Sequence, residues 1–321
     1  MTPVLLQRTR DRAVDLGYAA GWGLVKSTPH RLSRRWFTAA ADAASVHNGP
    51  GTRQLRKNLR RVVGPGWTEL QLDQLVGDAL RSYSRYWLET FRLPKMDKRA
   101  VADGVAANNQ GAQHIDAALE RGKGAVLTLP HIGNWDASGV WMVDRYGAFT
   151  TVAERLKPES LYDRFVEYRE GLGFEILPLT GGPRPPFEVL RERLRQNKVV
   201  CLLGDRDLSR TGVQVDFFGE PTRMPRGPAV LAATTGAALI PAAMWFTADG
   251  WGQVIHPPLP VPDGRLREQV PAVTQALAHV FEKDIAAHPA DWHMLQRLWL
   301  ADLPDRSDAR SPGGNPSGTS G

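Results

Sequence analysis

The chain has 321 residues, of which 42% are hydrophobic and 23% are charged, a balance typical of a globular protein. Its length allows one large domain or a core with a helical extension. The single cysteine, Cys201, excludes an internal disulfide framework and a metal site built from several cysteines. Because Cys201 lies in the apolar run 199–203, we expect a buried, inert thiol in a central strand.

The hydrophobic segments of the chain are short. None approaches the roughly 18–20 uninterrupted apolar residues that a bilayer-spanning helix needs. The N-terminus also lacks the compact apolar core of a secretory signal peptide. We therefore expect a protein that is made and kept in the cytoplasm.

Positive charge is concentrated near the N-terminus. Residues 1–62 hold 12 Lys/Arg and 3 Asp/Glu, whereas the formal net charge of the whole chain is +6. Trp22 and Trp36 lie among these basic residues, and such a mixture suits the headgroup region of an anionic membrane. Nucleic acid would also attract this charge, but we find no nucleic-acid motif and predict no such partner. We predict peripheral attachment to the cytoplasmic face of the cell membrane; the alternative is a solvated basic face on packed helices.

Up to about residue 122 the hydrophobic pattern is helical. Thr68 to Gln71 forms a capping box, which predicts a helix start. Apolar residues then recur on one helical face, and Pro94 is expected to end that helix. We predict a helical, membrane-associating segment over residues 1–122.

From residue 125 strand and helix patterns alternate. Near-continuous apolar strands separated by helices imply a sheet that is covered on both faces. We therefore predict an α/β fold, a mixed and mostly parallel sheet flanked by helices, over residues 123–304. Residues 305–321 are rich in Ser, Gly and Pro and are predicted to be a disordered tail. The predicted strands are 125–129, 149–153, 174–179, 199–204, 213–218, 238–247 and 252–256, and the predicted helices are 135–144, 159–171, 186–196, 226–236 and 266–287.

A histidine and an aspartate follow the first of these strands, in the segment HIGNWD at residues 131–136. Residues five apart do not face each other on a regular helix, but His131 in the turn and Asp136 in the first turn of the next helix can meet. Asp136 would then bind one imidazole nitrogen and leave the other to take a proton from a substrate hydroxyl. The alternative is a loop histidine beside a carboxylate that only satisfies backbone donors.

A second candidate block, residues 204–212, follows the predicted strand that contains Cys201. It carries Asp205, Ser209, Arg210 and Thr211. Ligands of open α/β sheets collect at the carboxyl ends of strands, where His131 also lies. The block is therefore a candidate to orient the base and to bind phosphate, and the alternative is a polar hairpin turn.

A third candidate is the Pro- and Gly-rich segment 218–228. We interpret it as a rigid loop that leads into a helix N-terminus, which would bind an anion through backbone amides together with Arg223 and Arg226. By composition, such loops are usually plain connectors.

Together, the HIGNWD element, the Asp205 block and residues 217–228 resemble the lysophospholipid acyltransferase superfamily, and within it the lipid A acyltransferase branch. Residues 86–94, 205–210, 219–225 and 288–294 are most similar to actinobacterial phosphatidylinositol mannoside acyltransferases. The resemblance covers roughly residues 10–300. Many lipid A enzymes carry glutamate where this chain has Asp136, and the shorter carboxylate leaves open whether Asp136 or Asp205 orients His131.

The resemblance implies acyl transfer from acyl-CoA, as co-substrate, to a hydroxyl of a glycolipid acceptor, with neither cofactor nor metal. A thioester is already activated, so a base that deprotonates the acceptor hydroxyl is sufficient. His131 would be this base, oriented by Asp136, Asp205 or both. Backbone amides of the turn after His131 are candidate donors to the developing oxyanion.

The resemblance also implies substrate-binding arginines. Arg169 aligns with an arginine that the family uses at its active site, and we expect it to contact the acyl-donor phosphate or the sugar acceptor. Arg210, with Ser209 and Thr211, is a second candidate of this kind. In each case the alternative is a surface arginine paired with a nearby carboxylate.

Two other classes of protein remain open from the residues alone. The same histidine and carboxylate would hydrolyse a thioester or lipid ester if they activated water instead of an acceptor hydroxyl. A catalytically silent lipid-binding protein at the membrane surface is the third possibility.

Overall fold

The computed structural model describes residues 23–303 except residues 24, 26, 156–157 and 210. The predictions made for Trp22, Arg210 and the tail 305–321 lie outside the described residues. The N-terminal half of the described chain is mainly helical. It contains α2 (His30–His47), α3 (Pro50–Val63), α4 (Glu69–Arg92), α5 (Lys98–Ala106), the short strand β1 (Asn109–Gln110) and α6 (Gln113–Glu120).

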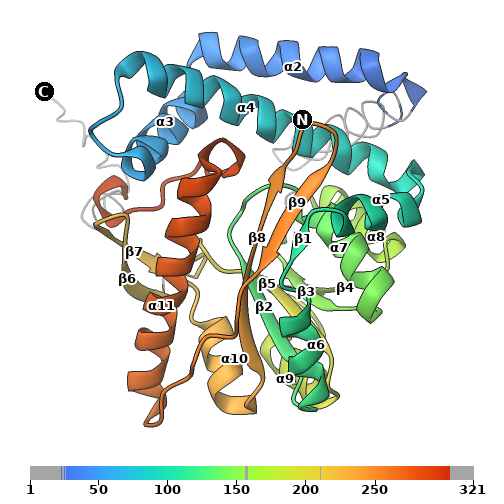
Figure 1. Cartoon of the computed structure of the whole chain (residues 1–321), viewed down its shortest axis with the longest axis vertical. Helices are drawn as coiled ribbons and strands as arrows, with labels where there is room; N and C mark the ends of the chain where they lie inside the picture. The colour runs from blue at the N-terminus through green and yellow to red at the C-terminus, as the bar shows by residue number, and fades with distance from the viewer. Residues whose placement is uncertain (1–22, 24, 26, 156–157, 210, 304–321) are drawn as a thin grey trace, which may run out of the picture.

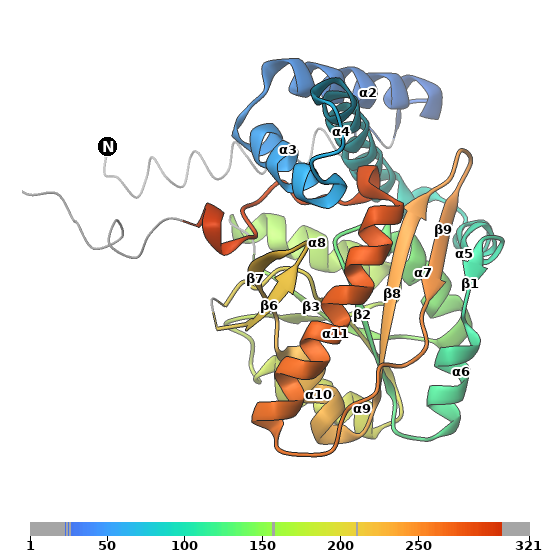
Figure 2. The same ribbon diagram turned by 60° about the vertical axis from the view of Figure 1, so that its left-hand side comes forward.

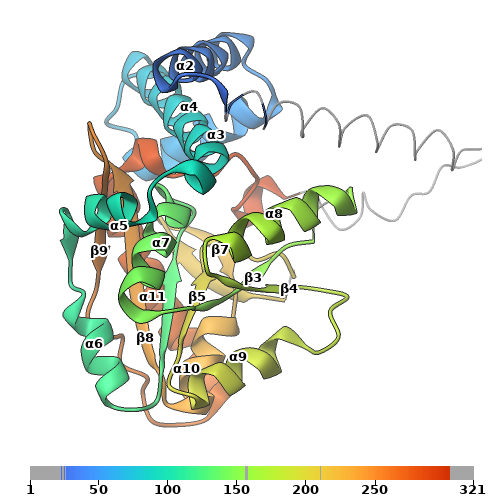
Figure 3. The same cartoon turned by 90° about the vertical axis from the view of Figure 1, so that its right-hand side faces the viewer.

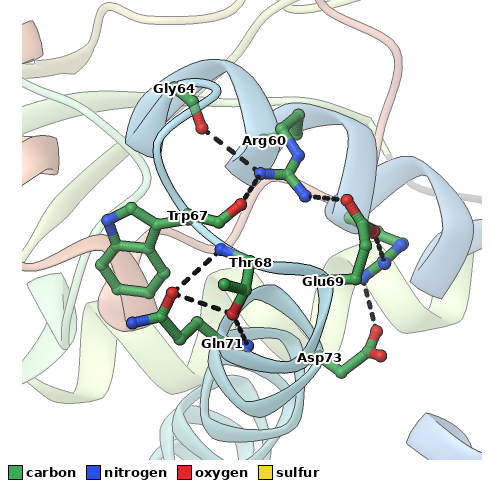
Figure 4. Close-up of polar contacts among 8 residues, drawn as sticks. Arg60, Gly64, Trp67, Thr68, Glu69, Gln71 and Asp73 are labelled. Atoms are coloured by element: carbon green, nitrogen blue, oxygen red, sulfur yellow. Dashed lines mark hydrogen bonds and ion pairs between the residues drawn. The ribbon is translucent and has the colours of Figure 1, made fainter.

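The longest of these helices begins and ends at the residues predicted from the sequence. Figure 4 shows the capping box of α4: the Thr68 hydroxyl accepts the Gln71 amide, and the Gln71 side chain accepts the Thr68 amide at 2.9 Å. Arg60 of α3 donates to the Trp67 carbonyl at 2.7 Å and pairs with Glu69, which fixes the turn between the two helices. At the other end, a 3₁₀ turn that contains Pro94 follows α4.

A seven-stranded mixed sheet forms the centre of the fold, as predicted. Its order is β1-β9-β8-β2-β5-β3-β4, and every neighbouring pair is parallel except β8 and β9. Its remaining strands are β2 (Ala125–Leu129), β3 (Thr150–Ala153), β4 (Glu175–Pro178), β5 (Val199–Leu203), β8 (Ala238–Phe246) and β9 (Trp251–Ile255).

Helices cover both faces of this sheet, and alternation along the strands explains why. Successive side chains of a strand point to opposite faces, so Leu127 belongs to a hydrophobic cluster with residues of α5, α6, α7 and α8, whereas Val126 belongs to one with residues of α9, α10 and α11. Figures 1 and 3 show the two layers, with α2 and α4 lying across one end of the sheet. The covering helices that come after β2 in the chain are α7 (Trp135–Tyr146), α8 (Glu159–Gly171), α9 (Pro186–Arg195), α10 (Gly227–Thr235) and α11 (Leu266–Ala287).

One local prediction is wrong. Residues 213–218 do not join the main sheet, and the segment 218–228 is not simply a loop. Strand β6 (Val213–Phe217) pairs with β7 (Glu220–Met224) in a separate antiparallel hairpin, visible in Figure 2 beside α11. The two turn residues, Phe218 and Gly219, both have positive φ angles of 50° and 76°, as a tight type I′ hairpin requires.

Within the described ranges, no helix is both long enough and apolar enough to cross a membrane.

Candidate active site

The turn that carries His131 is held tightly between β2 and α7. Asn134 caps α7, because its side chain accepts the Ala137 amide at 3.0 Å. Gly133 has a φ of +61°, and a Cβ atom there would lie 2.6 Å from the Met244 carbonyl oxygen. Glycine is therefore required at this position, since both the backbone conformation and the approach of β8 leave no room for a side chain.

His131 is bound by Asp205, not by Asp136. Strands β2 and β5 are parallel neighbours, so their carboxyl ends bring His131 and Asp205 together. The imidazole Nδ1 lies 2.6 Å from Asp205 Oδ1. The other carboxylate oxygen accepts the His131 amide at 2.9 Å and the Trp292 indole N–H at 3.0 Å.

This geometry favours an ionised, fixed carboxylate and a single imidazole orientation. Asp205 is fully buried, and burial alone would raise its pKa, but the charge and hydrogen bonds of His131, with the Trp292 indole, keep that pKa below its ordinary value. The His131 side chain remains 24% exposed. Among the described residues its Nε2 has no hydrogen-bond partner, so this nitrogen is available to a substrate hydroxyl.

Asp136 occupies the first turn of α7, as predicted, but its partner is different. Its carboxylate accepts two hydrogen bonds from Arg169 of α8, at 2.9 and 3.3 Å, and one from the Tyr86 hydroxyl at 3.2 Å. Burial and the neighbouring Asp136 charge raise the pKa of Tyr86 well above its ordinary value. The expectation that Asp136 contacts the imidazole is therefore wrong. Arg169 pairs with a nearby carboxylate, as its alternative had it, but this carboxylate is the buried Asp136 and not a surface acid.

Residues 291–294, which we call the C-terminal strap, are hydrogen-bonded to the turn that carries His131. The His293 amide donates to the His131 carbonyl at 2.8 Å, and the Gly133 amide donates to the Asp291 carbonyl at 2.9 Å. Ile132 donates to Pro130 at 2.8 Å. The Ile132 and Gly133 amides are both engaged, so neither is a free donor for an oxyanion; the proposal of a backbone donor in this turn is thereby narrowed to the amides of Asn134 and Trp135.

The His293 ring is a buried neighbour of the site that sequence reasoning did not single out. Its Nε2 lies 3.0 Å from the Ser82 hydroxyl, which itself donates to Asp291 at 2.6 Å. Nε2 must then carry the proton, which leaves the buried Nδ1 as an acceptor without a partner among the described residues. Burial, followed by the charge of His131, lowers the pKa of His293 to about 3.

An apolar cavity extends from Asp136 and Arg169 between α7 and the sheet. Its floor includes Leu127 and Cys201, and burial raises the pKa of the Cys201 thiol, as expected of an inert cysteine. Ser138, a buried hydroxyl without a hydrogen-bond partner, lies on the α7 side of the same cavity. The cavity has a volume of about 80 Å³, which is room for a short hydrocarbon segment and not for a whole long acyl chain.

The other predicted binding residues follow Asp205 along the chain. Ser209 and Thr211 are exposed and bond to each other at 2.9 Å, and Ser209 also bonds to Asp207 at 2.6 Å, as in the polar turn considered above. Arg223 lies on β7 opposite Gln214. Ser209 and Thr211 thus lie in the loop between β5 and β6, and Arg223 lies on a strand of the β6–β7 hairpin.

Several residues that hold the site were missed because no local pattern marks them. Glu89 of α4 accepts the Asn134 side chain at 2.6 Å and the Trp251 indole at 2.7 Å, and pairs with Arg85 at 2.7 Å. Only its place in a helix that is otherwise apolar on this face marks it as a buried acid in need of partners.

The chain matches the family described as bacterial lipid A biosynthesis acyltransferase over residues 7–301, and it belongs to that family. It is accordingly an acyltransferase. Among curated proteins it is similar to "Phosphatidylinositol mannoside acyltransferase" of Mycolicibacterium smegmatis, with 56% identity over 299 residues that cover 93% of this chain and 95% of the relative. The protein of the same name from Mycobacterium tuberculosis is 57% identical over 298 residues, which cover 93% of this chain and 92% of the relative.

Proposed function

We propose that the protein transfers a fatty acyl chain from acyl-CoA to a hydroxyl of a phosphatidylinositol mannoside, on a mannose. The relatives named for that activity support the acceptor, since they match the chain almost from end to end. The observation that carries the chemistry is the His131–Asp205 contact of 2.6 Å with Nε2 left open.

In this proposal Nε2 of His131 accepts the proton of the acceptor hydroxyl as that oxygen attacks the thioester carbonyl. The tetrahedral intermediate then collapses, the C–S bond breaks, and the proton passes from His131 to the departing CoA thiolate. Asp205 holds the imidazole and stabilises the cation that forms between these steps. Asp136 acts indirectly, by holding Arg169 and Tyr86 at the polar end of the apolar cavity, which would take a short segment of the acyl chain. Arg169 remains our candidate for contact with the donor or the sugar.

Product analysis tests the proposal. Purified protein is given one acyl-CoA and a phosphatidylinositol mannoside, and acylated lipid, free fatty acid and CoA are quantified by mass spectrometry. We expect acylated lipid in step with CoA release, and a loss of about 10²–10⁴-fold in His131→Ala with an unchanged melting temperature. Free fatty acid as the main product would show a hydrolase, and equal lipid binding without turnover would show a silent binding protein.

We also propose that the N-terminal helical segment attaches the protein peripherally to the cytoplasmic face of the cell membrane. Leu32 and Trp36 of α2 are 41% and 45% exposed beside the exposed Arg31 and Arg35, and basic residues near an anionic surface contribute about 1 kcal/mol each. Sedimentation with phosphatidylinositol liposomes should weaken as salt rises. Replacing Arg31, Arg34 and Arg35 together by Gln should weaken it further. Indifference to liposomes at low salt would contradict the proposal.

A further inference from the structure

A second large cleft lies on the other side of α4 from the His131 imidazole. It has a volume of about 740 Å³ and is enclosed by one face of α2, one face of α4 and the tip of the β8–β9 hairpin. Figures 1 and 2 show this hairpin rising toward α4, below α2. The Arg85 guanidinium fixes the hairpin there, since it donates to the carbonyls of Thr247 and Gly250 at 2.8 and 2.9 Å. These hydrogen bonds of Arg85 hold the hairpin in place as one wall of the cleft.

Its walls combine positive charge with apolar surface. Phe37, Leu88 and Phe246 supply apolar surface, and four arginines line the remainder. Arg85 is compensated by Glu89, and Arg81 is compensated by Asp42 and Asp78. The two remaining arginines, Arg34 and Arg92, are different.

Arg34 and Arg92 have no carboxylate partner among the described residues. Arg92 donates to the carbonyls of Val25 and Thr28, at 3.2 and 2.8 Å, which leaves its charge uncompensated. Arg34 is exposed, lines the cleft and forms no ion pair within the described chain.

Other groups at this end of the cleft add to the preference for an anion. The first turn of α2 contains no acidic residue and Pro29 provides no side-chain cap, so the partial positive charge of the helix N-terminus is not neutralised locally. Burial, followed by the charges of Arg92 and Arg34, lowers the pKa of His30, a lining residue. Of the lining carboxylates, Asp291 is bound by the Ser82 hydroxyl and the Phe246 amide, and only Asp249 is exposed without a described partner.

The cleft is separate from the acyl-transfer site and is placed to face a membrane. Asp291 lies between the two sites: it lines the cleft, and its backbone carbonyl accepts the Gly133 amide of the turn that carries His131. On α2, His30, Arg34 and Phe37 line the cleft, whereas Trp36 and Arg35, at intervening positions, do not. If α2 lies on the membrane surface, as proposed above, the headgroup of a lipid in that surface would lie beside the cleft.

We propose that this cleft binds the phosphodiester headgroup of an anionic phospholipid, a molecule other than the acceptor at His131, with Arg34 as the direct phosphate ligand and Arg92 as a supporting charge. The inference goes beyond the proposed reaction, because it assigns a second lipid site. A planar guanidinium is suited to two hydrogen bonds with phosphate oxygens, and the neighbouring apolar wall suits the glycerol end of the lipid.

Binding of a water-soluble headgroup tests this inference without involving turnover. The probe is glycerophosphoinositol, titrated calorimetrically against wild-type protein and against Arg34→Glu. The matched control is Arg35→Glu, which makes the same charge change one residue away, outside the cleft. We expect saturable binding that Arg34→Glu weakens about tenfold or more and Arg35→Glu leaves nearly unchanged, with equal melting temperatures for all three proteins.

The other outcomes are decisive as well. If inorganic phosphate binds as tightly as glycerophosphoinositol, with the same dependence on Arg34, the cleft is a free-phosphate site and the lipid assignment is overturned. Absence of saturable binding, or equal weakening by both variants, would show only the general attraction of a basic surface, and would overturn the site itself.

Discussion

Replacing Asp205 by Asn is the sharpest test of the site, because Asp136→Asn provides a matched comparison. Both changes keep the side-chain volume and remove one charge. In the structure Asp205 contacts the imidazole at 2.6 Å, whereas Asp136 contacts Arg169. The two variants should therefore fail in different ways.

The size of the Asp205 effect follows from the geometry. The charge centres of the carboxylate and of an imidazolium in this contact are roughly 4 Å apart, which corresponds to about 4 kcal/mol at an effective dielectric constant of about 20. This stabilisation exists only once His131 has taken the proton. Losing it should lower kcat about 10³-fold. The melting temperature should fall as well, because both buried carboxylate oxygens accept hydrogen bonds and the amide nitrogen of Asn cannot accept one.

Asp136→Asn should act mainly through stability. It leaves the partly buried Arg169 without its carboxylate, a change that costs up to about 3–5 kcal/mol of stability where the pair is buried, and its effect on kcat should follow that loss of structure. The assays are steady-state CoA release and thermal unfolding of each purified variant. A normal kcat in Asp205→Asn, together with a 10³-fold loss in a fully stable Asp136→Asn, would refute our assignment of the dyad.

Two further predictions concern stability and the apolar cavity. The pKa of His293 is lowered to about 3 in the folded protein and is about 6.5 in the unfolded chain, so the free energy of unfolding should fall as the pH decreases below about 6.5, by up to about 1.4 kcal/mol per pH unit. Urea unfolding should show that this free energy depends less on pH in His293→Gln, and an equal pH dependence in both proteins would contradict an origin in His293. A Cβ atom on Gly139 would lie 2.3 Å from Phe174 Cζ, so Gly139→Ala should cost about 1–3 kcal/mol of stability and slow the turnover of long-chain more than short-chain acyl-CoA. The control Gly77→Ala, where the nearest atom lies at 3.9 Å, should do neither; equal chain-length dependence in the two variants would show that this cavity does not take the acyl chain.

Much of the fold could be predicted because its signals are local. Buried parallel strands such as β2 and β5 are continuous apolar runs, and the start of α4 is marked by a capping box of four residues. Strand β7 was missed because Pro221 is typical of a loop. It is tolerated here because the two-stranded hairpin leaves edges that need no further backbone donor.

The site was only partly predictable. The position of His131 follows from a strand end, which the sequence displays. Its partner depends on which strands are neighbours: β2 lies beside β5, and this adjacency brings in Asp205 from 74 positions away. The expected contact between Asp136 and the His131 imidazole is absent because Arg169 of α8 and Tyr86 of α4 bind that carboxylate instead. Such competition between distant elements has no counterpart in local spacing.

The strap of residues 291–294 makes the order of synthesis matter for activity. His131 leaves the ribosome long before His293, yet the backbone of the catalytic turn is completed only when the strap arrives, 162 positions later. The Trp292 indole, which the strap also delivers, supplies one of the hydrogen bonds of Asp205. A nascent or prematurely ended chain would therefore carry its base and its acidic partner without the support that orients them. If His131 and Asp205 act as proposed, a chain that ends before residue 291 should therefore lack acyl transfer.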